Sequence, residues 1–181
     1  MPHPSLHTDR LVLRPYVLSD VSDLVRLAGA REVAATTLRI PHPYCEEDAV
    51  GFINTFAVEA EMGTSARFAI TLRDDGQLCG GVGLHIDKDH QHAELGYWIG
   101  VPYWGRGYAT EAVRTVVRYG FETLKLRRIY ASCFAHNQTS TRVLQKIGMQ
   151  YEGCQRSHIS KWGKFYDLDL YGMVNAGSSP G

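Results

Sequence analysis

The sequence contains no long apolar run, and none of its hydrophobic segments approaches the roughly 18 residues typical of a membrane-spanning helix. It does not open with the charged and then apolar stretch of a secretory leader. We therefore expect a cytoplasmic protein with no membrane partner. Cysteine is scarce, since Cys45, Cys79, Cys133 and Cys154 lie far apart and form no C-x-x-C pair. This pattern predicts reduced thiols rather than disulfides.

Neither sign of charge is in excess, because 19 Lys and Arg residues balance 19 Asp and Glu residues. Nucleic-acid binding depends on a basic field, so we expect no nucleic-acid partner. His90 and His92 are close together but have no third ligand nearby in the sequence, whereas zinc sites take three or four protein ligands. We therefore assign no metal site and expect both imidazoles to face the solvent.

Apolar periodicity predicts helices and strands along a single domain over residues 1–174. Helices are expected at 20–29, 46–62, 109–124 and 139–147, and strands at 10–16, 68–72, 78–86, 93–100, 128–134, 150–160 and 164–171. Segment 30–45 is expected to be a loop because Pro41 and Pro43 interrupt it. Segment 175–181 is small and polar and is expected to be a disordered tail.

These elements predict an α/β fold with a central mixed, mostly antiparallel sheet flanked by about four helices. The helix at 109–124 connects the strands at 93–100 and 128–134, and such a connection suits parallel neighbours. We expect the ends of this parallel pair to splay and leave a cleft. The helix shows the clearest buried face, at Ala109, Ala112, Val113, Val116, Val117, Gly120, Phe121 and Leu124.

The turn before this helix, Trp104-Gly105-Arg106-Gly107-Tyr108-Ala109, is suited to phosphate. Its two glycines have no Cβ, so backbone N–H groups can converge on one point. The first N–H groups of a helix also have no partner within the helix, and the helix dipole adds a partial positive charge there. The strand before it carries Gly96 and Gly100, positions where another extended chain can lie close. An extended amide arm that ends in a pyrophosphate would fit both parts, and coenzyme A has that shape.

The GRGYATEA segment, its preceding strand and residues 137–149 resemble the acetyl-CoA site of the GNAT superfamily of N-acetyltransferases. Four further stretches resemble the RimJ/RimL-like branch of this superfamily, which includes ribosomal-protein N-terminal acetyltransferases. They are TDRLVLRPYVLSDVSDL, PHPY, EEDA and FYDLDLYGM. The likeness covers residues 6–173. One departure is Trp104, which stands where the superfamily often has Gln or Arg, and Arg106 is expected to supply the positive charge instead.

The resemblance implies which residues bind acetyl-CoA. They are Trp98, Ile99, Gly100, Trp104, Gly105, Arg106, Gly107, Tyr108, Ala109, Thr110, Asn137 and Ser140. A strand N–H within 98–100 is expected to stabilise the oxyanion that forms during acyl transfer. The aromatic residues among them could instead stack on bases, but the balanced charge favours core and cofactor-wall roles.

The resemblance also implies the acid and the base. Glu94 is the leading candidate for the general base, with Asp167 and Asp169 as rivals and a solvated strand-end carboxylate as the structural alternative. Many superfamily members carry a tyrosine seven residues after the asparagine, where this chain has Leu144. Ser140 matches the serine that the RimJ/RimL-like branch has near the thiol. Alternatively, Asn137 and Ser140 only cap the helix.

The function implied is acetyl transfer from acetyl-CoA to a primary amine, by direct attack in a ternary complex. The acceptor is a protein N-terminus or a small molecule, and loops 36–46 and 157–167 would shape its pocket. A non-catalytic acyl-CoA sensor or interaction module is the alternative. A nucleotide-phosphate site ranks last because the turn lacks the Gly-Lys-Ser/Thr ending of a P-loop. The oligomeric state stays open, a homodimer included.

Overall fold

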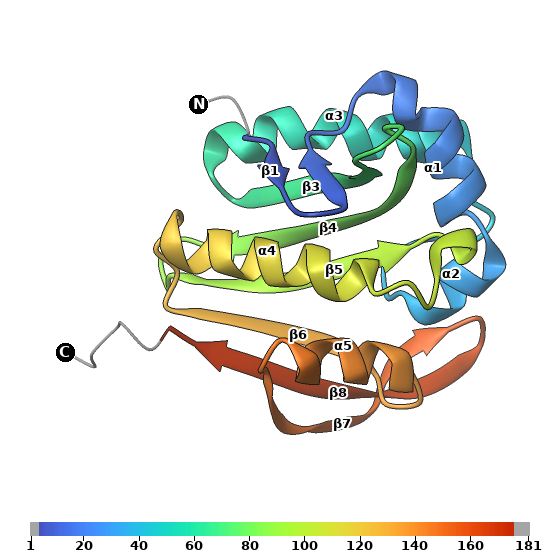
Figure 1. The fold of residues 1–181 in the computed structure, drawn as a ribbon. Helices are drawn as coiled ribbons and strands as arrows, with labels where there is room; N and C mark the ends of the chain where they lie inside the picture. The colour runs from blue at the N-terminus through green and yellow to red at the C-terminus, as the bar shows by residue number, and fades with distance from the viewer. Residues whose placement is uncertain (1–3, 176–181) are drawn as a thin grey trace.

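The computed structural model describes residues 4–175 and shows a mixed α/β architecture (Figure 1). Eight strands form one sheet in the order β1-β2-β3-β4-β5-β6-β8-β7. The strands are β1 (Leu6–His7), β2 (Leu11–Arg14), β3 (Ser65–Leu72), β4 (Leu78–Asp87), β5 (His92–Ile99), β6 (Arg128–Phe134), β7 (Gln150–Lys161) and β8 (Lys164–Val174). The helices are α1 (Val21–Ala28), α2 (Arg31–Thr36), α3 (Glu46–Met62), α4 (Tyr108–Glu122) and α5 (Gln138–Lys146), with short 3-10 turns at Leu18–Asp20 and Val101–Tyr103.

The sheet is antiparallel at every pair of neighbouring strands except one. β3, β4 and β5 form an antiparallel meander, in agreement with the predicted mostly antiparallel sheet. β5 and β6 are the parallel pair, as the crossover through α4 predicts. The predicted fold class is therefore confirmed.

Helices cover both faces of the sheet. In Figure 1, α4 and α5 cross in front of the strands. The larger core lies on this side, where Val113 and Val116 of α4 and Leu144 of α5 pack against strand residues such as Phe68 and Ile129. On the other face, Leu24 of α1 and Ile53 of α3 pack against Ala69 and Leu78. The sheet is thus buried between two helical layers.

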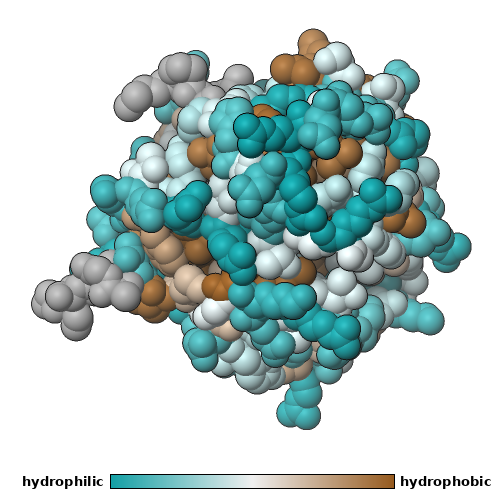
Figure 2. Space-filling view, in the orientation of Figure 1, coloured by the Kyte–Doolittle hydropathy of each residue, from teal (hydrophilic) through white to brown (hydrophobic). Residues whose placement is uncertain are grey.

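The predicted buried face of α4 is confirmed. Ala112, Val113, Val116, Val117 and Gly120 are buried, and Ala109, Phe121 and Leu124 pack at the edge of the same core. Gly120 makes the helix fit closely to the sheet, because a Cβ there would lie 2.8 Å from Ile129 Cδ1. Hydrophilic side chains cover most of the outer surface over α4 and α5 (Figure 2). The helix is therefore amphipathic in the way its spacing predicts.

The structure differs from the local sequence interpretation in three places. Segment 30–45 is not entirely a loop, because α2 forms at Arg31–Thr36 and buries Val33 and Ala34. The two-residue strand β1 was not predicted at all. Asn175 was assigned to the disordered tail, but its N–H donates to Arg127 O at 2.9 Å, and the remainder of that predicted tail lies outside the described residues. Among the described helices, none is both long and apolar enough to cross a membrane.

Candidate active site

The parallel strands β5 and β6 separate soon after they meet. They are in register at only three positions, His92 with Arg128, Ala93 with Ile129 and Glu94 with Tyr130. Glu94 is therefore the last residue of β5 that pairs with β6, and the rest of the strand diverges from β6 while it stays paired with β4. The splayed parallel pair predicted from the sequence is present.

A cavity of about 430 Å³ lies at this split, within the usual size range of small-molecule sites. It brings together Glu94, Trp98 and Ser140 of the predicted site. Thr36, the last residue of α2, and residues 37–41 after it also line the cavity. Neither Asp167 nor Asp169, the rival bases, is among the described residues around this cavity. The Asp167 side chain instead accepts a hydrogen bond from Ser157 N–H at 2.7 Å.

The Glu94 carboxylate is paired with Arg39, which the sequence analysis did not identify. Arg39 Nη2 lies 2.5 Å from Glu94 Oε2, and the Arg39 side chain is 70% exposed while Glu94 is 20% exposed. Because one partner is mostly in water, the pair contributes at most about 1 kcal/mol to stability. Its main effect is to hold the carboxylate, and the loop that carries Arg39, across the mouth of the split.

Three further hydrogen bonds, from two side chains, fix that loop. Lys161, at the end of β7, donates to Thr37 O at 2.5 Å and to Ile40 O at 3.4 Å. The Asn137 side chain donates from Nδ2 to Thr36 O at 3.4 Å. The β7–β8 hairpin and the start of α5 thus position the segment that closes one side of the cavity.

Ser140 and Tyr97 form a hydroxyl pair inside the cavity. Tyr97 Oη lies 2.7 Å from Ser140 Oγ and 3.3 Å from Ser140 O. The pKa of the Tyr97 phenol is raised by burial, although its hydrogen bond with Ser140 acts in the opposite direction. The phenol is therefore protonated at neutral pH. Leu144 stands in the place of the usual tyrosine, and a different tyrosine, supplied by β5, lies beside Ser140.

The helix cap and the Ser140 hydroxyl are separate. The Asn137 side chain accepts a hydrogen bond from Ser140 N–H at 3.1 Å, so Asn137 is the N-cap of α5. The Ser140 hydroxyl is bonded to Tyr97 instead. The Ser140 backbone thus takes part in the helix cap, whereas its hydroxyl group does not.

The glycine-rich turn adopts the backbone geometry that its sequence predicts. Gly105 and Gly107 have φ angles of 74° and 81°, in the left-handed region that favours glycine. Glu111 N–H donates to Gly107 O at 3.1 Å, the bond that starts α4. The N–H groups of Tyr108, Ala109 and Thr110 come before that bond and point out of the helix end, the arrangement that binds anions.

Charged side chains surround this turn. Arg10 lies 2.6 Å from Glu111 and also donates to Arg106 O at 3.0 Å. Burial raises the pKa of Glu111, but hydrogen bonds from Thr8 and Arg10 outweigh it and hold that pKa below its usual range. Arg10 thus compensates the negative charge of Glu111, and the Arg106 guanidinium lies over the Tyr103 ring at 6.0 Å from its centroid.

Trp104, which departs from the superfamily pattern, has a structural contact. Its indole N–H donates to Ile99 O at 2.7 Å and so ties the turn to the end of β5. A side chain in that role orients the turn without adding a charge. Arg106 is the cationic side chain that the turn itself contributes.

The end of β5 shows which backbone N–H groups face the split. Gly100 donates its N–H to Cys79 O at 2.9 Å, so this group is used within the sheet. Backbone groups alternate along a strand, so Trp98 faces β4 as Gly100 does, and Tyr97 and Ile99 face the side from which β6 has departed. Within the predicted range 98–100, the Ile99 N–H is therefore the one that faces the split.

The two glycines singled out in and after this strand differ in their surroundings. A Cβ at Gly96 would have no heavy atom within 4 Å, which fits the open space expected there. A Cβ at Gly100 would lie 2.9 Å from Leu27 Cδ2, so that glycine is required by packing against α1. Gly96, rather than Gly100, is the position where a ligand chain can approach the strand.

Comparisons with known proteins agree with this geometry. The sequence profile of the family described as Acetyltransferase (GNAT) domain matches residues 10–150. The uncharacterized N-acetyltransferase YoaA of Bacillus subtilis (strain 168) is 36% identical over 172 residues, covering 94% of this chain and 97% of that protein. The [Ribosomal protein uS5]-alanine N-acetyltransferase of Escherichia coli (strain K12) is 28% identical over 192 aligned positions, covering 100% and 96%.

The fold is also shared with a solved structure of RimL, a ribosomal L7/L12 alpha-N-protein acetyltransferase, in complex with coenzyme A. The two superpose with a TM-score of 0.85 at 18% identity, over 94% of this chain and 98% of that one. The profile match spans most of the sequence, and the curated relatives are matched over nearly their full length. The chain therefore belongs to the GNAT family of N-acetyltransferases, with RimJ/RimL-like ribosomal-protein acetyltransferases among its relatives.

Proposed function

We propose that this protein transfers an acetyl group from acetyl-CoA to a primary amine, by direct attack of the amine on the thioester within the β5–β6 split. One observation carries the proposal: Glu94 and the Ser140–Tyr97 pair line the same cavity. A base for the amine and a proton donor for the departing thiolate are thus present at one place. Glu94 lies on β5 and Ser140 on the helix that follows β6.

The donor side of the proposal rests on the turn before α4. The N–H groups of Tyr108, Ala109 and Thr110, together with Arg106, would hold the pyrophosphate of coenzyme A. The pantetheine arm would lie along β5 past Gly96, where a Cβ would meet no atom within 4 Å. The solved RimL relative contains coenzyme A, which supports the same donor class for this chain.

Each residue of the cavity then has a chemical task. Glu94, held by Arg39, removes a proton from the acceptor ammonium, directly or through water. The N–H of Ile99 or of Tyr97 stabilises the tetrahedral oxyanion, which needs a donor fixed in advance. Ser140 gives its proton to the departing thiolate and takes up the second proton that the attacking nitrogen loses, while Tyr97 stays protonated and holds the Ser140 hydroxyl by a hydrogen bond.

The acceptor side is mainly apolar. Tyr16, Tyr44, Phe52 and Trp98 line the cavity, with Leu38 and Ile40 from the loop after α2. Gly81 leaves room for two of these side chains, since a Cβ there would lie 2.0 Å from Tyr16 Oη and 2.5 Å from Trp98 Nε1. An amine carried on a small or apolar group fits these walls, which suits a protein N-terminus as well as a small molecule.

A panel of acceptors tests the proposal. Purified protein would be given acetyl-CoA with peptides that begin with alanine, serine or methionine, and with a set of small primary amines. We expect one class to accelerate acetyl-CoA consumption and to gain one acetyl group by mass spectrometry. Coenzyme A binding without turnover on any acceptor would contradict catalysis and favour the non-catalytic acyl-CoA sensor.

A further inference from the structure

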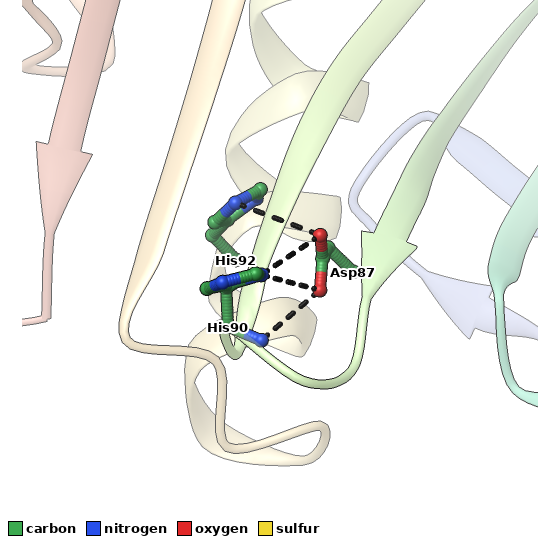
Figure 3. Close-up of side chains that lie close together, drawn as sticks. All are labelled: Asp87, His90 and His92. Carbon is green, nitrogen blue, oxygen red and sulfur yellow. Dashed lines mark hydrogen bonds and ion pairs between the residues drawn. The ribbon is translucent and has the colours of Figure 1, made fainter.

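A second group of ligand-type side chains lies outside the cavity, at the turn that joins β4 to β5. It consists of Asp87, the last residue of β4, His90 in the turn and His92, the first residue of β5. Figure 3 shows both imidazole rings directed toward the Asp87 carboxylate. The sequence shows no third ligand-type residue next to the two histidines, and the fold brings Asp87 beside them.

The spacing of the three groups is close to that of a metal site. His90 Nδ1 lies 3.1 Å from each Asp87 oxygen, and His92 Nε2 lies 4.0 Å from Asp87 Oδ2. One ligand atom from each residue falls within 4.8 Å of the others. Ligand atoms about 2.0–2.2 Å from a tetrahedral zinc ion are about 3.4 Å apart. Small rotations of the side chains would therefore complete the geometry.

The three side chains are held by contacts of their own. Asp87 Oδ1 accepts a hydrogen bond from His90 N–H at 3.0 Å, which fixes the turn. The two imidazole rings stack with their centroids 5.8 Å apart. His92 is paired with Asp87 on β4 and with Arg128 on β6, and its ring packs edge-on against Tyr130. The strand register therefore sets the position of two of the three ligands.

The charge and exposure of the group also suit a cation. The positive charge of nearby Arg128 is compensated by its ion pair with Glu152. The side chains of His90, Asp87 and His92 are 73%, 42% and 32% exposed, so water can occupy further coordination positions.

We propose that Asp87, His90 and His92 form a binding site for one divalent transition-metal ion of the zinc class. Two imidazole nitrogens and one carboxylate oxygen suit zinc, cobalt and nickel, whereas magnesium and calcium prefer oxygen ligands. With three protein ligands and open positions for water, the site is expected to exchange its ion rather than to stabilise the fold as a closed structural site does. His92, its residue on β5, lies two residues before Glu94, at the start of the segment paired with β6.

Zinc and cobalt titrations of tag-free protein test the site. The parent is expected to bind one Zn²⁺ per chain by calorimetry, and Mg²⁺ at the same concentration is expected to give no binding heat. His90→Ala and Asp87→Asn should each weaken Zn²⁺ binding by about 10-fold or more. Asparagine keeps an oxygen acceptor for His90 N–H, so the turn is retained. His158→Ala removes an exposed histidine elsewhere and should leave binding unchanged.

The Co²⁺ spectrum identifies the ligands independently. The expected complex shows the d–d absorption of nitrogen and oxygen ligands and no thiolate charge-transfer band. A thiolate band would place the ion on an exposed cysteine, Cys45 or Cys154, and would overturn the proposal. Absence of saturable Zn²⁺ binding, or equal affinity in the parent and both ligand variants, would also overturn it.

Discussion

Replacement of Gly107 by valine tests the donor site at the start of α4. Gly107 is the N-cap of that helix and has a φ angle of 81°, which a residue with a Cβ adopts only at a cost of about 1–2 kcal/mol. A Cβ there would also contact Arg10 Nη2 at 3.5 Å. The substitution should therefore disturb the N–H groups that would hold the pyrophosphate, and it should destabilise the fold only moderately.

Coenzyme A binding and backbone strain change the melting temperature in opposite directions. Coenzyme A at about 100 times its dissociation constant should stabilise the parent by about 2.7 kcal/mol. A protein of this size gains about 2–4 °C in melting temperature for each kcal/mol, so the parent should shift by about 5–10 °C. The strain in Gly107→Val should lower the unliganded melting temperature by about 2–8 °C.

Gly76→Val is the matched control. Gly76 has a φ angle of 72° in the β3–β4 turn, and a Cβ there would meet no heavy atom within 4 Å. Valine at this position should cost a similar strain and leave the coenzyme A shift intact. Thermal melts of the three proteins with and without coenzyme A are the assay. A full shift in Gly107→Val would refute the assignment of the pyrophosphate to this turn.

Two further predictions follow from side-chain contacts. Ser140→Ala should lower kcat by about 10- to 100-fold with little change in the coenzyme A melting shift. Adding Tyr97→Phe to this variant should reduce kcat little further, because the two hydroxyls act as a unit. A loss of stability with unaltered kcat in Ser140→Ala would contradict this role. Hydrogen bonds lower the pKa of Glu111 in the folded state. The contacts of Glu111 therefore stabilise the fold at pH values above its unfolded-state pKa of about 4.3, and this stabilisation is lost as the pH falls through the lower, folded-state pKa. Glu111→Gln should therefore melt lower than the parent at pH 7, with the difference shrinking in acid; a difference independent of pH would contradict it.

The spacing of apolar residues predicted much of the fold, because it shows which side of a helix or strand is buried. The helix Glu46–Met62 and the strand Arg128–Phe134 were predicted with the bounds that the structure shows. The helix Arg31–Thr36 was missed because six residues give fewer than two turns, too few for a periodic signal. Nearby prolines in the sequence also favoured a loop.

The contacts of the site could not be predicted in the same way. Arg39 and Glu94 are 55 positions apart, and Tyr97 and Ser140 are 43 positions apart. Such pairs depend on how a loop and a helix end are brought to one strand, which no local pattern describes. Glu94 and Ser140 themselves were identified by resemblance to a family, and the structure places both of them around one cavity.

The pH dependence of kcat/KM for Glu94→Gln tests the central claim most directly. With an acceptor found in the panel, the variant should be slower than the parent by about 10²- to 10⁴-fold at pH 7. Its rate should recover partly as the pH approaches the pKa of the acceptor amine, while the coenzyme A melting shift stays at the parent value. Asp167→Asn, which alters a carboxylate outside the cavity lining, should keep the parent profile. Parent-like activity of Glu94→Gln at pH 7 would contradict the account and would assign the base to another group, and a slowed Asp167→Asn in the same series would identify that group as Asp167.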